Sequence, residues 1–247
     1  MLELQAVGKT FGEVQALHGI DLHVRRGTVS GLIGPNGSGK TTLVNIITGV
    51  YAPDSGRVFL DGKNVSRASA DQITRLGVSR SFQNIRIFNR MSVLENVIAA
   101  LIGHHKPGLA TLLGRAKRTG DPRVTAARRA LETVGLLEQG DLFASELPLP
   151  LRRRLEIARA LACDPKVLVL DEPAGGMTPA ETASISELIR SRIAPGRTCV
   201  VIEHKMDLIS HVCEHLCVLN HGEKIAEGDP RSVVSQPEVI EAYLGRA

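Results

Sequence analysis

The sequence predicts an α/β fold organised around a parallel sheet. Apolar segments of strand length occur at residues 29–34, 167–173 and 198–204, and helical patterns separate them along the chain. Continuous apolar runs are typical of strands that are buried on both faces, as the strands of parallel sheets are. Strands that alternate with helices also favour parallel pairing, because a helical crossover returns the chain to the same end of the sheet.

The first part of the chain consists of short β elements. Residues 2–7 and 14–24 alternate or cluster like strands. After a helix predicted at 42–49, the turn sequences PDSG and LDGKN flank a strand at 57–60. Short strands joined by tight turns favour antiparallel pairing, so we expect an N-terminal antiparallel β flap beside the sheet.

Helical patterns dominate the middle of the chain. Ser92 and Glu95 have the spacing of a capping box, which predicts a helix at 92–102. Strand signals are then absent from the sequence as far as residue 163, and Asp121-Pro122 marks another helix start.

The chain of 247 residues is long enough for one large domain with its own core. We expect a single domain, in which a helical subdomain at 91–163 is inserted into a core formed by 1–90 and 164–247.

The C-terminal part continues the alternation of strands and helices. Thr178 and Glu181 begin another helix, and further strands are predicted at 215–220 and 223–229. The segment HVCEHLC has the residue types of a metal site. Because 206–212 reads as a helix and 215–220 as a strand, its side chains are not expected to converge, and we favour no zinc site.

Composition limits the class of protein. Hydrophobic residues make up 43% of the chain and charged residues 23%, as in globular domains, and the formal net charge is +4. With five Phe, two Tyr and no Trp, the chain offers little aromatic surface for stacking on bases, so we expect no nucleic-acid partner. The four cysteines show no disulfide framework, and neither a membrane-spanning apolar run nor a signal peptide is evident, which predicts a cytosolic chain.

Basic residues concentrate in two groups. Such groups either meet acidic lipid headgroups or form hydrated helix faces, and we favour hydrated faces because surface helices usually carry these charges. The first group is Arg115, Lys117, Arg118, Arg123, Arg128 and Arg129, and the second is Arg152, Arg153 and Arg154.

The segment GPNGSGKTT contains the pattern G-x-x-x-x-G-K-T between a predicted strand and a predicted helix. Its glycines let the backbone bend so that successive N–H groups point at one anion, which predicts a cradle for the phosphates of ATP. Lys40 is expected to hold the β- and γ-phosphates, and Thr41 to ligate Mg²⁺. The predicted nucleotide-binding residues of this P-loop are Gly34, Pro35, Asn36, Gly37, Ser38, Gly39, Lys40, Thr41 and Thr42.

Two acids follow the apolar run VLVL. A buried strand would deliver Asp171 and Glu172 to its carboxyl end, which is where α/β sheets bind ligands. We expect Asp171 to bind Mg²⁺, directly or through water, and Glu172 to polarise the water that attacks the γ-phosphate.

Taken together, the P-loop, the Asp171-Glu172-Pro173 run, His204 in VVIEH and Gln83 in RSFQN resemble the ABC-transporter ATPase family over nearly the whole chain. Within that family, RRRLEIARAL and the ending EVIEAYLGRA look most like the ATPase subunits of branched-chain amino acid importers. The resemblance implies a P-loop NTPase core. It also implies that Gln83 senses Mg²⁺ and the attacking water while its loop contacts the membrane subunit, that His204 binds the γ-phosphate, and that Phe11 stacks on adenine.

Two positions depart from the family pattern. The family's signature, which resembles LSGGQ and grips the γ-phosphate held by the opposite subunit, falls on residues 147–151, where this chain reads LPLPL. Two prolines remove N–H donors and no hydroxyl is present, so the groups that recognise phosphate are missing. Lys205 stands where related importers usually have an acid.

The resemblance implies an ATP-hydrolysing motor subunit of a membrane importer for branched-chain or other amino acids. We expect it to lie on the inner face of the membrane against permease subunits, paired with a different ATP-binding subunit that supplies an intact signature. Two alternatives stay open: an ATPase of lipopolysaccharide export, and a nucleotide-binding subunit with little hydrolysis of its own.

Overall fold

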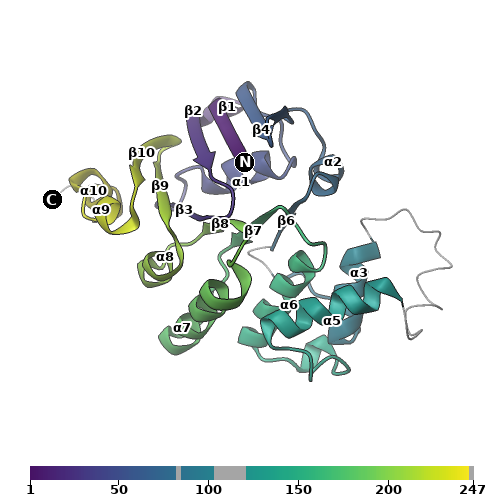
Figure 1. The fold of residues 1–247 in the computed structure, drawn as a ribbon. Helices are drawn as coiled ribbons and strands as arrows, with labels where there is room; N and C mark the ends of the chain where they lie inside the picture. The colour runs from purple at the N-terminus through teal and green to yellow at the C-terminus, as the bar shows by residue number, and fades with distance from the viewer. Residues whose placement is uncertain (82–84, 103–120, 245–247) are drawn as a thin grey trace.

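The computed structural model describes residues 1–81, 85–102 and 121–244, which form two sheets with helices packed between and around them (Figure 1). The smaller sheet is antiparallel with the strand order β2-β1-β4-β5, which confirms the predicted N-terminal flap. Its strands are β1 (Leu2–Phe11), β2 (Val14–Val24), β4 (Ser55–Leu60) and β5 (Lys63–Asn64). The β5 strand falls where the sequence predicted only a turn, because Lys63 and Asn64 pair back onto Leu60 and Phe59.

The larger sheet has the strand order β10-β9-β3-β8-β7-β6, and five of its six strands run parallel. The strands are β3 (Val29–Ile33), β6 (Val78–Arg80), β7 (Val167–Asp171), β8 (Thr198–Ile202), β9 (His215–Asn220) and β10 (Glu223–Gly228). Every residue of β3, β7 and β8 is buried, as their continuous apolar runs predicted.

The capping residues predicted at several helix starts make the expected local hydrogen bonds. Ser92 and Glu95 accept each other's backbone N–H groups, as do Thr178 and Glu181. The Asp121 carboxylate caps the helix that Pro122 begins. The described helices are α1 (Lys40–Ile47), α2 (Ala70–Arg75), α3 (Val93–Ile102), α5 (Pro122–Val134), α6 (Leu149–Leu161), α7 (Pro179–Leu188), α8 (Met206–Val212), α9 (Pro230–Val234) and α10 (Pro237–Leu244).

Two apolar clusters cover the two faces of the larger sheet. On one face α1 lies between the two sheets, with Leu43 and Ile47 buried against the flap and against β3 and β8. On the other face α7 and α8 pack on the sheet, and α3, α5 and α6 continue the same apolar cluster. Figure 1 shows α3, α5 and α6 together near the β6 edge of the sheet and α9 and α10 near the β10 edge.

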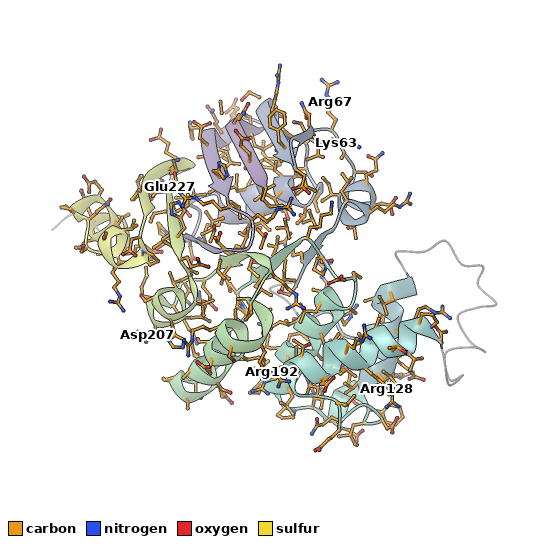
Figure 2. The ribbon with its side chains drawn as sticks, in the orientation of Figure 1. Lys63, Arg67, Arg128, Arg192, Asp207 and Glu227 are labelled. Atoms are coloured by element: carbon orange, nitrogen blue, oxygen red, sulfur yellow. The ribbon has the colours of Figure 1, made fainter. Side chains whose placement is uncertain are left out.

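The second group of basic residues does not form a hydrated face, in contrast to the sequence-based expectation. Arg152 donates to the carbonyls of Leu147 and Ser145, and Arg154 donates to Ser184 on α7. These half-buried arginines stabilise the start of α6 and join it to neighbouring segments. In the first group, Arg128 on α5 is exposed (Figure 2), whereas 115, 117 and 118 lie outside the described residues.

The residues of HVCEHLC have separate surroundings. Cys213 and Cys217 are buried, His211 pairs with Glu187, and His215 pairs with Glu227. Within the described ranges, no group of three or more His, Cys, Asp and Glu side chains is arranged to hold a metal ion. In the same part of the chain, no helix has the length and apolar character needed to cross a membrane.

Candidate functional site

The P-loop connects the end of β3 to the start of α1 and lies in a tightly packed position. A Cβ on Gly34, whose φ is 150°, would lie 2.1 Å from the carbonyl oxygen of Leu219. Gly39, the N-cap of α1, has a φ of 101°, and a Cβ there would lie 2.8 Å from the oxygen of Ala16. Only glycine fits both positions, so the backbone itself forms the surface of the loop.

The Lys40 ammonium lies inside the loop. Its Nζ donates to the carbonyls of Gly34 and Pro35 at 2.7 and 2.8 Å. Burial lowers the pKa of Lys40, and the nearby carboxylates of Glu172 and Asp171 oppose that shift. The structure therefore brings the predicted phosphate-binding lysine and the two predicted acids into one electrostatic site.

Asp171 ends β7 and is held by an arginine from the neighbouring strand. Arg80, at the end of β6, donates to Asp171 Oδ2 at 2.6 Å and to Asn45 Oδ1 on α1 at 2.7 Å. Both side chains of the ion pair are only 10% exposed. Arg80 and Asn45 were not identified from the sequence, because their roles depend on the pairing of the three-residue strand β6 with β7.

Glu172 follows directly and has a left-handed backbone, with a φ of 47°. Its N–H donates to Ile202 O at the end of the adjacent strand β8 at 2.9 Å. A non-glycine residue in this conformation costs free energy and is common at functional sites. The turn is therefore fixed from both β7 and β8.

His204 lies just beyond β8, and its side chain is 56% exposed. The preceding Glu203 is fully buried, and its Oε2 lies 3.6 Å from His204 Nδ1. Because β3, β8 and β7 are parallel neighbours, their carboxyl ends place the P-loop, His204 and the Asp171-Glu172 pair along one edge of the sheet. Gln83 lies outside the described residues.

The flap contributes an aromatic pair. Phe11 ends β1, is 42% exposed, and meets Tyr51 edge-on at a centroid distance of 5.2 Å. Lys9 Nζ lies 5.4 Å from the centre of the same ring. An exposed ring of this kind is a surface on which a flat base can stack. The contribution of Tyr51 to this surface was not predicted from the sequence.

The segment that replaces the family's signature begins α6. Pro148 is the N-cap and Pro150 lies in the first turn, as expected for a residue without an N–H group. The N–H groups of Leu147 and Leu151 donate to the carbonyls of Ala144 and Pro148. Of the five positions, only the half-exposed Leu149 retains an amide for an outside acceptor.

The described residues fit a triphosphate with a divalent cation. The glycine positions leave the P-loop surface without side-chain bulk, and Lys40 supplies a positive charge beside it. The exposed Thr41 is the second residue of α1, and the Asp171 carboxylate comes from the end of β7. A hydroxyl and a carboxylate are oxygen ligands of the type that Mg²⁺ prefers.

A groove of about 620 Å³ is lined by residues of α2, β6, α3 and α6. It passes beside Ser81 and Arg86, on either side of residue 83, and beside the half-exposed Phe88. Arg159 stacks over the Phe88 ring at 5.3 Å. A second cavity of about 630 Å³ lies between α7 and α8, beside Lys205 and Asp207. Figure 2 labels Asp207 at the start of α8.

Comparison with known families gives two matches. Residues 17–175 match the family described as ABC transporter, and residues 223–247 match the family described as branched-chain amino acid ATP-binding cassette transporter. The chain is 38% identical over 251 residues to the high-affinity branched-chain amino acid transport ATP-binding proteins LivG of Escherichia coli and BraF of Pseudomonas aeruginosa. Each alignment covers 100% of this chain and 98% of the relative.

Solved structures of cassettes from this family share the fold. A crystal structure of the ADP conformation of an ATP-binding cassette of an ABC transporter superposes with a TM-score of 0.89 at 35% identity, covering 100% of this chain and 99% of that one. A dimeric cassette in a post-hydrolysis state, bound to ADP and Pi, gives 0.78 at 26% identity over 94% of this chain and 99% of that one. The chain therefore belongs to the ABC transporter family, as an ATP-binding ATPase subunit with a P-loop NTPase fold.

Proposed function

We propose that this chain binds Mg²⁺–ATP at the P-loop and hydrolyses it to drive an importer of branched-chain amino acids. The observation that carries the chemistry is that the P-loop with Lys40 and the Asp171-Glu172 pair, which follow β3 and end β7, lie along one edge of the larger sheet. The substrate class is supported by the 38% identity to LivG and BraF over the whole chain and by the C-terminal match at 223–247.

Each residue has a role that its position supports. Lys40 and the P-loop amides bind the phosphates, and Phe11 stacks on the base. Thr41 and Asp171 would hold Mg²⁺, which neutralises phosphate charge when bound. Glu172 accepts a proton from the attacking water, and the exposed His204 donates to the γ-phosphate.

Gln83 would complete the site. By resemblance to the family it senses Mg²⁺ and the attacking water. Ser81 and Arg86 line the groove of about 620 Å³, and by the same resemblance the loop of Gln83 contacts the membrane subunit.

The groove is our candidate binding site for a permease segment at the inner face of the membrane. It combines the apolar side chains of Phe88 and Ile87 with the charged side chains of Arg86 and Glu156. Such a mixed lining suits an amphipathic helix that extends from a membrane protein. Binding there would hold the chain at the membrane although its described helices do not cross one.

We also propose that the chain pairs with a different ATP-binding subunit. The dimeric cassette described above shows that such domains pair. The LPLPL segment can contribute at most one amide to a nucleotide on the opposite subunit. The nucleotide held by this chain's own P-loop would instead be completed by an intact signature from the partner.

Turnover of the purified chain alone tests this pairing. We expect negligible ATP hydrolysis at any protein concentration, and hydrolysis at least about a hundredfold faster in the membrane complex that a tag on this chain captures. Robust hydrolysis that rises steeply with the concentration of the isolated chain would contradict the proposal, because it would show that two LPLPL segments suffice.

The same LPLPL segment favours a second candidate function, that of a nucleotide-loaded subunit with little hydrolysis of its own. It differs from the first in what Glu172 does, because in this second function Glu172→Gln would leave ATP turnover of the membrane complex unchanged. Mass spectrometry of the captured membrane proteins decides between amino acid import and lipopolysaccharide export.

A further inference from the structure

Three charged side chains hold the loop at residues 173–178, between β7 and α7. Glu203 Oε1 accepts the N–H of Ala174 at 2.9 Å, and Lys205 Nζ donates to the carbonyl of Met177 at 2.8 Å. Arg153, on α6, donates to the carbonyl of Gly175 at 3.3 Å. The loop is thus attached to the segment around His204 at its beginning and near its end, and to α6 between these points.

Glu203 is the first attachment. Its carboxylate is fully buried, and its Oε2 accepts the N–H groups of His204 and Lys205 at 3.0 and 3.2 Å. One carboxylate therefore joins the backbone of the loop to the backbone of the His204 segment. Hydrogen bonds from amides to a buried carboxylate are stronger than neutral ones, so this attachment is firm.

Lys205 is the second attachment. Besides the Met177 carbonyl, its Nζ donates to the buried hydroxyl of Thr182 on α7 at 2.9 Å. The Thr178 amide and hydroxyl hold the pKa of Glu181 low, and the Lys205 charge adds to this effect. The Lys205 ammonium is therefore directed at the end of the loop and the first turn of α7.

Two attachments fix the orientation of the loop, which a single attachment would not do. A loop fixed at a single point can pivot about it, whereas a loop fixed at Ala174 and at Met177 keeps its orientation relative to His204. An acid at position 205, as related importers usually have, has no N–H to donate to the Met177 carbonyl, so it would leave only the Glu203 attachment.

We infer that Lys205 is a positioning residue that, together with Glu203, makes the loop at 173–178 and the His204 segment move as one unit. This inference rests on the proposed function, in which the chain pairs with a different ATP-binding subunit and His204 contacts the γ-phosphate. If the loop moves when the two subunits pair, the His204 segment is then expected to move with it. Lys205 itself touches no reacting atom.

Lys205→Met tests the inference, because methionine keeps much of the apolar stem and removes the ammonium. Lys205→Arg restores a positive donor, and Lys166→Met is the matched control, since Lys166 is 56% exposed and pairs with Asp61 on the flap. Hydrogen exchange on the full chain follows the amides of residues 175–178, and kcat and KM for ATP are measured in the captured membrane complex.

For Lys205→Met we expect the amides of Met177 and Thr178 to exchange about tenfold faster. We also expect kcat to fall about tenfold while KM for ATP stays within about twofold, because the P-loop is untouched. Lys205→Arg should recover most of the exchange protection and most of kcat, and Lys166→Met should match the wild type.

Three outcomes would overturn the inference. Unchanged exchange would mean that Lys205 does not hold the loop, and faster exchange with unchanged kcat would mean that loop and His204 are not coupled in the reaction. A rise in KM with general loss of exchange protection would show that Lys205 only supports the fold. Exchange needs no turnover, so it remains informative if the wild-type complex fails to hydrolyse ATP, a failure that counts against the proposed function itself.

Discussion

At the scale of single residues, Arg80 and Asp171 form a buried ion pair within the site. Both side chains are 10% exposed, and Arg80 also bonds to Asn45 on α1, so one guanidinium connects two strands and a helix. Removing one member of a buried pair leaves an uncompensated charge, which typically costs about 3–5 kcal/mol. The pair therefore fixes the position of the carboxylate that we assign to Mg²⁺.

Arg80→Met should lower the free energy of unfolding by about 3–5 kcal/mol, measured by urea denaturation at neutral pH. The double variant Arg80→Met with Asp171→Asn should recover part of the loss, because no charge is then buried alone. Arg75→Met, which breaks an exposed pair with Asp71, is the control and should cost no more than about 0.5 kcal/mol. Equal losses for the buried and exposed pairs would contradict this account.

The sequence predicted the residues whose chemistry is local to a motif. The P-loop and the Asp171-Glu172 pair were predicted from local patterns and His204 from the family resemblance, and all three lie along one edge of the sheet. Arg80 and Glu203 could not be predicted, because their partners lie far away in the sequence and are brought close only by strand pairing. The roles of Phe11, His204 and Gln83 remain predictions.

At the scale of secondary-structure elements, buried thiols line both sides of the sheet. Burial raises the pKa of Cys199 on β8 and of Cys217 on β9 to about 12. In the unfolded chain a thiol ionises near pH 8.5, whereas these stay protonated in the folded chain. The unfolded state then binds fewer protons above that pH, so each thiol lowers stability as the pH rises from about 9 toward 12.

Cys199→Ala isolates this effect. Relative to the variant, the wild type should lose about 1.4 kcal/mol more unfolding free energy for each pH unit above about 9, and the difference between them should be constant below pH 8. Urea denaturation at pH 7, 8, 9 and 10 measures both curves. Parallel curves over the whole range would show that Cys199 ionises equally in both states.

The groove between the larger sheet and α6 gives a prediction about assembly. Phe88→Asp places a charge where an apolar face of a permease helix would pack, so capture of membrane proteins should fall at least about tenfold while ATP affinity is unchanged. Ile240→Asp is the matched control, because Ile240 is 45% exposed on α10, away from the groove. If Phe88→Asp captured membrane proteins as well as the wild type does, this groove would be ruled out as the permease-binding site.

The long elements of the fold could be predicted, and the short ones could not. The apolar patterns at 167–173, 198–204 and 215–220 are strong enough to identify these strands without knowledge of their tertiary contacts. The helices α2 and α9 have six and five residues, too few for a helical period to be recognised, and they depend on their caps and their packing. The division at residues 90 and 163 stays a prediction.

At the scale of the whole molecule, the chain has a complete set of catalytic candidates but an incomplete signature. Glu172 and His204 lie at the carboxyl ends of β7 and β8 in the larger sheet, and the LPLPL segment lies at the start of α6. This division is the one expected under the proposed pairing of two different cassettes, with this chain providing chemistry at its own P-loop and little recognition at the opposite one. The loop at 173–178 lies between these two regions, bonded to Arg153 on α6 and to Lys205.

The central claim is that Glu172 activates water for hydrolysis at this chain's own P-loop. Glu172→Gln in the captured membrane complex tests it most directly, with Lys40→Ala as the variant that should lose ATP binding itself. We expect Glu172→Gln to lower ATP turnover at least about a hundredfold while ATP affinity, measured by calorimetry, stays unchanged. Turnover equal to that of the wild-type complex would contradict the account, because hydrolysis would then occur elsewhere.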